Sequence, residues 1–504
     1  MNEEMKTSAQ HFKEKFPVFC IATLIYAILY ALCTYDNFSG LAYGLFVMSS
    51  VVYILFCFMT LEIPLKKGSI FYIASIVLLA IATFCTDDVK IVFMNKTGIF
   101  FLTMLFLLNN VFDTRKWQFC KYVASLVITC IMSIAEICAP FENAYWYCKN
   151  KWDKKNGRFL YGFLGVVIAI PIVVVIFALL SSADVVFRDY AINIFGDINI
   201  VDMIIMTFMA GAMFMASYCV MSYLSKKEID ENVRDTKKIE PLLVIPATSL
   251  LTILYIAFSV IQIAYLFIGE LKLPDGYSYS EYAREGFFQL LAVAILNLVI
   301  VLVCAAFAKP NKLLKIVLTV MSLCTFVMII SSAARTLTYI QFYYLTFLRI
   351  FVLWCLLVLA IIFVGVIVYI YKDKFPLFKY AVVVVTCLYI GLAFSHPDYI
   401  VAKVNLSATD ENANEFFLGG GFDDYRFLRY LSADAAPAVA DWMEDMGYSY
   451  TEGEGYINDK YYFFYEAKRF GDNFWDGMKK KTEDMGIKDF NFSIYMAKSL
   501  IKEQ

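Results

Sequence analysis

The sequence predicts an all-α polytopic membrane protein of about eleven (10–13) transmembrane helices, followed by a soluble, mainly helical α+β tail. Three observations lead to this prediction. Hydrophobic residues make up 61% of the 504 residues and charged residues only 17%, whereas soluble domains are about 45–50% apolar and about 25% charged. Apolar runs of about 20 residues, the length that a helix needs to cross a bilayer, recur along the chain. The charges, finally, divide the chain into two unlike parts.

The charge balance separates a membrane body from an acidic tail. Residues 1–396 carry 31 Lys and Arg against 25 Asp and Glu, whereas residues 397–504 carry 12 against 20. The first residues are mixed in charge and no small-residue cleavage site follows the first apolar run, so we expect a retained helix rather than a cleaved signal. The expected division is a cytoplasmic N-terminus (1–16), a first membrane group of four or five spans (17–158), a membrane core of seven spans (159–396) and an acidic soluble domain (397–504).

Twelve apolar runs are candidates for spans. The run at 91–112 contains Lys96, and the run at 119–139 contains Lys121 and Glu136, which makes these two the weakest of the set. The last seven runs are cleaner. The candidates are 17–35, 41–60, 70–86, 91–112, 119–139, 159–180, 201–224, 242–269, 287–308, 311–333, 347–371 and 377–396.

Lys and Arg alternate between rich and poor loops after residue 140, and this alternation predicts the orientation. Loops 141–158 and 225–241 hold five each, whereas loop 181–200 between them holds one. Short loops rich in Lys and Arg stay in the cytoplasm, so the tail is expected outside and the N-terminus inside. This requires an even number of crossings before loop 141–158, but five runs precede it. Either 91–112 or 119–139 fails to span, or the N-terminus is outside; we favour eleven crossings.

Five ionisable residues are expected to share one membrane face. Loops 181–200, 270–286 and 334–346 are separated by two spans each, so they lie on the same side as the tail. Carboxylates and guanidinium groups clustered there would neutralise one another and form a site for a ligand or a lipid headgroup. Plain anchoring of the helix ends at the interface is the alternative. The residues are Asp184, Arg284, Glu285, Arg335 and Asp398.

Local patterns predict further structure in the tail. Residues 424–446 have a helical pattern that Pro437 is expected to break into two. The aromatic run 461–465 is typical of a β-strand and predicts a hairpin. Near the other end of the chain, Gly40 and Gly44 have the spacing that lets helices approach closely, although one such match does not identify a dimer face.

The chain contains no catalytic motif that we could find, so its status as an enzyme stays open. It has no phosphate-binding loop and no metalloprotease or esterase motif. His11 and His396 are its only histidines, and no Cys-x-x-Cys pair is present, so we expect no cofactor and no metal site. Nucleic acid is not an expected partner, because the basic residues of the body are spread over many loops.

Several strings resemble one bacterial family. The most specific is Tyr282-Ala283-Arg284-Glu285-Gly286-Phe287, and further strings are Ser182-Ala183-Asp184, Pro397-Asp398 and Leu431-Ser432-Ala433-Asp434-Ala435-Ala436-Pro437, with Arg335, Tyr339, Thr346, Arg349 and Asn405. Over roughly residues 160–440 these resemble the family named domain of unknown function 4173. His396 stands where that family usually has an asparagine. The resemblance implies a polytopic bacterial membrane protein and no activity, because none is established for the family.

Three functions remain open. The first is a non-enzymatic sensor or scaffold of the bacterial envelope, with membrane lipids as partners and an envelope protein or small ligand bound through the tail. The second is a transporter or lipid flippase, favoured by the number of spans and by polar in-span groups such as Gln262 and Asn297. The third is a transferase acting on lipid-linked substrates, for which Asp184 and Glu285 are the candidate bases.

Overall fold

The computed structural model describes most of the chain. The described residues are 2–37, 39–151, 200–229, 237–264, 279–343, 345–416, 429–445, 462–483 and 485–503, together with scattered positions between 165 and 187. The candidate span 159–180 therefore falls almost entirely outside them. Side chains are described within these ranges except near some of their ends, among them those of Arg284 and Glu285.

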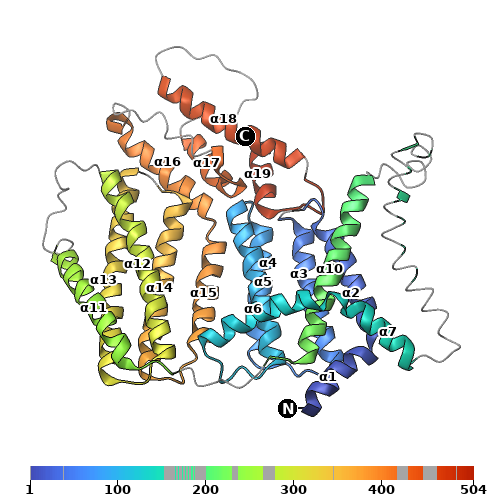
Figure 1. Ribbon diagram of the computed structural model, residues 1–504. Coiled ribbons are helices and arrows are strands. Elements are labelled where there is room, and N and C mark those ends of the chain that lie inside the picture. The colour runs from blue at the N-terminus through green and yellow to red at the C-terminus, as the bar shows by residue number, and fades with distance from the viewer. Residues whose placement is uncertain are drawn as a thin grey trace.

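The body is a bundle of long helices, most of which run along one common axis (Figure 1). The N-terminus lies at one end of this bundle, and the tail covers the opposite end, which we call the tail side. The helices of the body are α1 (Asn2–Glu14), α2 (Phe16–Thr34), α3 (Leu41–Thr60), α4 (Ser69–Cys85), α5 (Val89–Val111), α6 (Phe119–Ala135), α7 (Ala139–Lys151), α10 (Ile200–Lys226), α11 (Pro241–Ile263), α12 (Tyr279–Phe307), α13 (Lys312–Tyr343), α14 (Phe347–Tyr371) and α15 (Leu377–Phe394).

The helices of the body have the length and composition of membrane spans. Ten helical stretches among the described residues are long and apolar enough to cross a bilayer, and α4, with 17 residues, is slightly shorter. Large apolar side chains such as Phe208 and Leu242, which are 76% and 85% exposed, point away from the bundle. Lipid is the solvent that such a surface fits. The chain is thus an all-helical polytopic membrane protein.

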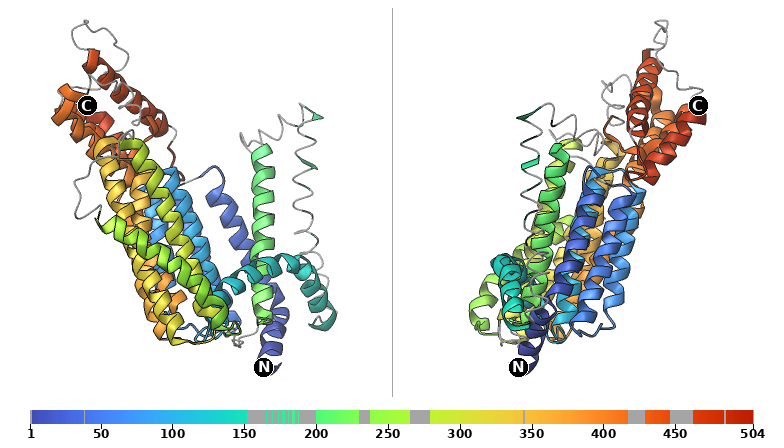
Figure 2. Two further views of the ribbon diagram at one scale, coloured as in Figure 1. Left: turned by 60° about the vertical axis from the view of Figure 1, so that its left-hand side comes forward. Right: turned by 90° about the vertical axis from the view of Figure 1, so that its right-hand side faces the viewer.

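Helix α6 differs from its neighbours in direction. Its composition qualifies it as a span, because the stretch Phe119–Asn150 is long and apolar. Its axis nevertheless runs across the bundle, near the end that carries the N-terminus, in the views of Figures 1 and 2. Four helices, α2 to α5, therefore run along the bundle before the chain turns sideways.

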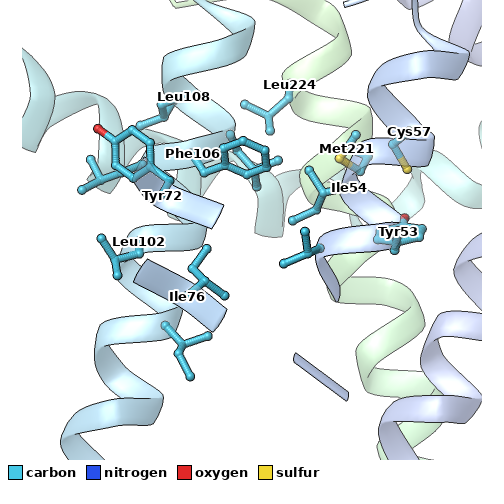
Figure 3. Packing of buried hydrophobic residues seen from close by; sticks show 14 of the residues in the cluster. Tyr53, Ile54, Cys57, Tyr72, Ile76, Leu102, Phe106, Leu108, Met221 and Leu224 are labelled. Carbon is cyan, nitrogen blue, oxygen red and sulfur yellow. The ribbon is translucent and has the colours of Figure 1, made fainter. Parts of the chain in front are cut away.

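The largest buried core joins the first helices to α10, although α5 ends at Val111 and α10 begins only at Ile200. Figure 3 shows its packing, with Phe106 of α5 facing Ile54 of α3 and Met221 of α10. Phe106 and Met221 are 1% and 3% exposed. Burial of aromatic and branched side chains between helices fixes the positions of the loops at both ends of this group.

The tail has a separate core and is helical. Its elements are α16 (Pro397–Phe416), a short 3-10 turn (Ala433–Ala435), α17 (Ala436–Asp445), α18 (Tyr462–Glu483) and α19 (Phe492–Glu503). Val439, Met443 and Trp475 are completely buried at its centre. Pro437 lies in the first turn of α17, where a missing N–H costs little. Of the expected helix 424–446, residues 436–445 form α17, residues 433–435 form the 3-10 turn, and residues 424–428 lie outside the described residues.

The α+β tail that the sequence predicted is wrong. The described part of the tail contains no strand, and residues 462–465 of the expected hairpin form the first turn of α18. The reason lies further along the same helix, where Phe474, Trp475 and Met478 are buried at helical spacing. An apolar face of this period stabilises a helix over several turns, and it outweighs the β propensity of a short aromatic run.

Candidate functional site

The candidate site is the contact between the tail and the tail side of the bundle. Three turns of the body end there: the α2–α3 turn (35–40), the α4–α5 turn (86–88) and the α13–α14 turn (345–346). Figure 2 shows the helices of the tail lying directly over these helix ends. Hydrogen bonds join the tail to all three turns, so the tail is fixed to several helices at once.

Asp434 lies at the centre of this contact, and its side chain is completely buried. Its Oδ2 accepts hydrogen bonds from the Thr86 hydroxyl at 2.5 Å and from His396 Nδ1 at 3.2 Å. Its Oδ1 accepts from the Ser493 hydroxyl at 2.5 Å and from the Asp87 backbone N–H at 3.1 Å. Four donors from three separate segments, residues 86–87, His396 and Ser493, therefore satisfy one carboxylate. We call Thr86, Asp87, His396, Asp434 and Ser493 the docking cluster.

The charge of Asp434 is stabilised despite its burial. Burial by itself would raise its pKa, but the hydrogen bonds from His396, Ser493 and Thr86 outweigh that effect and lower the pKa. The hydrogen bond to Asp434 in turn raises the pKa of His396, against the opposing effect of its partial burial. The pair is therefore a charged contact that ties the α15–α16 junction to the tail.

The same geometry does not form a hydrolytic triad. In such a triad the histidine takes a proton from the serine and the acid holds the other ring nitrogen. Here the Ser493 hydroxyl bonds to the Asp434 carboxylate rather than to His396. The docking cluster thus has the residue types of a nucleophilic site without the order of contacts that activates a nucleophile.

A loop of the tail also caps helix α3. The first N–H groups of a helix have no partner inside it. The N–H of Leu41 donates to the Phe490 carbonyl at 2.9 Å, and that of Ala42 donates to the Lys488 carbonyl at 3.2 Å. Asn491 is fully buried and donates to the Thr86 carbonyl at 2.8 Å. The start of α3 and the end of α4 are therefore completed by residues between 400 and 450 positions away.

Gly40 permits this close approach. A Cβ atom added there would lie 2.6 Å from the Asp489 Cα and 2.7 Å from the Lys488 carbonyl oxygen. Both are backbone atoms, which cannot rotate out of the way. Gly44 by contrast has open space around it. The glycine pair of the sequence thus serves the contact between the tail and the body at Gly40.

A second charged group lies beside the docking cluster. Lys90 Nζ is 3.6 Å from Asp88 Oδ1 and 3.4 Å from Asp398 Oδ1, and both carboxylates are 2% exposed. The other oxygen of Asp398 accepts the Ser432 backbone N–H at 2.9 Å. Burial and the neighbouring Asp398 raise the pKa of Asp88 to about 6. One lysine therefore joins two buried acids, of which Asp88 titrates near neutral pH.

Asn405 forms a third connection to the body. Its side chain accepts the Leu345 N–H at 2.8 Å and donates to the Leu345 carbonyl at 2.9 Å. Just beyond this turn, the Arg349 guanidinium lies 4.0 Å from the centre of the Tyr339 ring. These residues, which carried the family resemblance, hold the α13–α14 turn against α16.

The five residues predicted from the sequence occupy different places. Asp398 belongs to the docking contact through Lys90 and Ser432. Arg335 lies in α13, where its Nη2 is 3.4 Å from Gln262 Oε1 of α11, and it packs against Gly286 of α12. The Arg284 and Glu285 backbones lie in the first turns of α12. Asp184 is exposed, and its carboxylate accepts the Phe187 N–H at 3.3 Å, as an N-cap would.

Sequence reasoning missed the centre of the contact. Asp434 belongs to a string that carries the family resemblance but was not predicted as a site residue. The same holds for four residues outside any such string: Thr86, Asp88, Lys90 and Asn491. One signal was available, because Asp434 is the only charged residue in the alanine-rich string 431–440. Among the described residues, no group of three or more His, Cys, Asp and Glu side chains could hold a metal ion.

Comparison with known proteins gives a family but no activity. The model of the family described as "Domain of unknown function (DUF4153)" matches residues 73–442. Its number differs from that of the family that the strings resembled, and both families are uncharacterised. No curated protein and no solved structure matches the chain. The match starts within α4, ends within α17 and includes most of the docking cluster. A polytopic membrane protein that this one family model matches over residues 73–442, the chain belongs to the DUF4153 family.

Proposed function

We propose that the chain is a non-enzymatic sensor or scaffold of the bacterial plasma membrane, in which the tail transmits binding events to the bundle. The observation that carries this proposal is the burial of Asp434 between the α4–α5 turn, the α15–α16 junction and α19. A ligand or an envelope protein that binds the tail changes the strength of this contact. Because the contact joins the tail to several helix ends, a change in its strength shifts the arrangement of the membrane helices.

The proposed orientation places the tail outside the cell and the N-terminus in the cytoplasm. Turns at the end opposite the tail are basic, with Lys66 and Lys67 after α3 and Arg115 and Lys116 after α5. The positive-inside rule assigns that end to the cytoplasm. The transverse direction of α6 leaves four crossings before loop 141–158, which is the even number that the rule requires.

In this proposal Asp184, Arg284, Glu285, Arg335 and Asp398 lie on the outer face. Asp398 has a role within it, because it joins α16 to Lys90 and to the segment before Asp434. Arg335 and Gly286 join the outer ends of α12 and α13. These residues then act as structural contacts that hold helix ends in register, and the surface open to a ligand is that of the tail.

Transport is the second candidate, favoured by a polar seam between α11, α12 and α13. Ser331 donates to Gln262 at 2.6 Å, and Asn297 donates to Thr325 at 3.0 Å, all four residues being buried. The Asn297 side-chain oxygen has no hydrogen-bond partner among the described residues. Buried polar groups at this depth are a recurrent feature of substrate paths. A membrane transferase is less favoured, because the carboxylate of Asp184, one of its two candidate bases, accepts the Phe187 N–H as a helix cap would.

The test compares two full-length variants in a deletion strain grown under acid, detergent and cell-wall stress. Asp434→Asn removes the central charge, whereas Asp441→Asn removes an exposed charge from the same helix region. We expect Asp441→Asn to restore wild-type growth and Asp434→Asn to fail at equal membrane abundance. Full rescue by Asp434→Asn would overturn the proposal. Purified protein in liposomes should also move neither solutes nor lipids; turnover there would favour transport instead.

A further inference from the structure

A cavity of about 460 Å³ lies between α2, α3, α5 and α10, apart from the docking contact. Its walls are mainly apolar and aromatic, and Ile54, Ile76, Phe106 and Met221, which are labelled in Figure 3, are among the residues that line it. Among the residues that line it, Lys96 is the single charged one. Such a wall fits a hydrocarbon chain, and the lysine marks one polar point along it.

The cavity extends along the bundle axis from near its tail side. Tyr43 is the third residue of α3 on that side, and Ile54 follows it by eleven positions, which is about 16 Å along a helix. Half of a 30 Å hydrocarbon core is about 15 Å. The cavity thus has roughly the length that one lipid leaflet gives an acyl chain.

Lys96 is directed toward the tail side of this cavity. Helical side chains lean toward the N-terminus of their own helix, and the N-terminus of α5 lies on the tail side. The Lys96 ammonium lies 4.7 Å from the centre of the Tyr43 ring, at the start of α3. Lysines near helix ends reach the headgroup region in this way. The positive charge therefore meets the lipid at the depth where an anionic headgroup joins its chain.

A second cavity of about 450 Å³ is an uncharged counterpart to the cavity at Lys96. It lies against another face of α5, between that helix and α15, with Gly98, Trp354 and Thr386 in its wall. No charged residue lines it. The two cavities share volume and apolar character and differ in charge, so binding that depends on an anionic head separates them.

We propose that the cavity at Lys96 binds one chain of an anionic phospholipid, with the lipid phosphate beside the Lys96 ammonium and the Tyr43 ring. Lys96 and the phosphate form a charge-assisted contact, and the Tyr43 ring lies beside it. The chain lies along Val47, Val51 and Ile54 of α3. A neutral phospholipid gains the same apolar contact but has a zwitterionic head, so the site distinguishes lipids by charge.

The experiment measures lipid retention by native mass spectrometry and affinity in nanodiscs for the purified full-length chain. The probes are phosphatidylglycerol, phosphatidylcholine and oleate. We expect Lys96→Gln to bind phosphatidylglycerol about tenfold more weakly and Lys96→Arg to bind it like the wild type. Lys121→Gln in α6 is the matched loss of charge and should change nothing. Ala216→Trp, which fills the cavity from α10, should abolish retention of any lipid there.

Three outcomes overturn the assignment: equal binding by Lys96→Gln and the wild type, equal preference for phosphatidylcholine, or binding of oleate alone. Hydrogen exchange at residues 86–91 and 487–501 is recorded on the same samples. It should be the same in Lys96→Gln as in the wild type, because none of these residues lines the cavity. A failure of the lipid site and a failure of the sensor proposal are thus told apart.

Discussion

Asp434 accepts a 2.5 Å hydrogen bond from Thr86, although 348 positions of sequence separate them. Thr86 lies in the α4–α5 turn, and Asp434 lies in the short 3-10 turn before α17. The bond therefore joins the first group of membrane helices to the tail. With His396 and Ser493 on the same carboxylate, this contact makes the docked tail dependent on one buried charge.

Replacement of Asp434 by asparagine should release the tail locally while leaving the membrane helices folded. The amide places N–H hydrogens against hydroxyl donors and removes the charge that His396 faces. We expect a loss of about 2–3 kcal/mol in the free energy of local opening, which speeds exchange roughly 30- to 150-fold. Hydrogen exchange of residues 432–445 and 485–501 measures it. Unchanged exchange there would contradict the central role of Asp434, and Asp441→Asn serves as the control.

The membrane body could be predicted because its signals are local. An apolar run of about 20 residues carries the information for a span within itself. The sequence leaves open whether 91–112 or 119–139 fails to span, and α6, which the second run forms, lies across the axis of the bundle in Figures 1 and 2. In the structure Glu136 forms an ion pair with Lys226 of α10, so the end of α6 is held by a charged contact rather than by lipid.

The docking contact could not be predicted in the same way. The donors to Asp434 come from three segments that no periodicity connects. Thr86, Ser493 and Asn491 are also residue types found in any loop. His396 stands where the resembled family usually has an asparagine, and the backbone conformation at this position suits either residue. Its φ of 48° lies in the left-handed region, which asparagine and histidine tolerate better than most residues.

Introduction of a side chain at Gly40 should weaken the docking from the body side. In Gly40→Val the Cβ meets the backbone at Asp489 and Lys488, so the tail loop must move and the N-cap bonds of α3 lengthen. We expect a cost of about 1–3 kcal/mol. Limited trypsin cleavage at Lys488 in the detergent-solubilised protein measures the release. Gly44→Val, where the structure has open space, should be cleaved like the wild type; equal cleavage of both variants would refute the contact.

The docking should strengthen as the pH falls from 8 toward 5. Asp88 has a folded pKa of about 6, raised from 3.8, so the stability it contributes is complete below 3.8 and is lost as the pH rises through 6. This contribution amounts to about 3 kcal/mol at most. His396 acts in the same direction, because its pKa is raised and its contribution is lost as the pH rises above that pKa. Asp434, with a lowered pKa, weakens the docking only in more acidic solution.

Two variants separate the contributions to this pH response. Asp88→Asn should make the docking independent of pH between about 4 and 6. His396→Asn keeps a residue that tolerates the left-handed backbone and should remove the part of the response near neutral pH. Exchange of residues 485–501, corrected for the intrinsic pH dependence of exchange, is the measurement. A wild-type response in both variants would assign the pH dependence to other groups.

The effect of Gly286→Ala on stability should reverse its sign when Arg335 is also replaced, in a double-mutant cycle of the two residues. A Cβ at position 286 would lie 1.9 Å from Arg335 Nη1, so Gly286→Ala forces the guanidinium away from Gln262 and should destabilise the wild type by about 1 kcal/mol. In an Arg335→Ala background the obstruction is gone, and the same change should stabilise the helix by about 0.5–1 kcal/mol, because alanine replaces glycine in α12. Thermal unfolding in detergent measures both values.

Gly211→Ala in α10, with nothing near its added Cβ, should be stabilising in either background. If Gly286→Ala has the same effect with and without Arg335, the two residues are not in contact, and the packing of α12 against α13 on the tail side needs another cause.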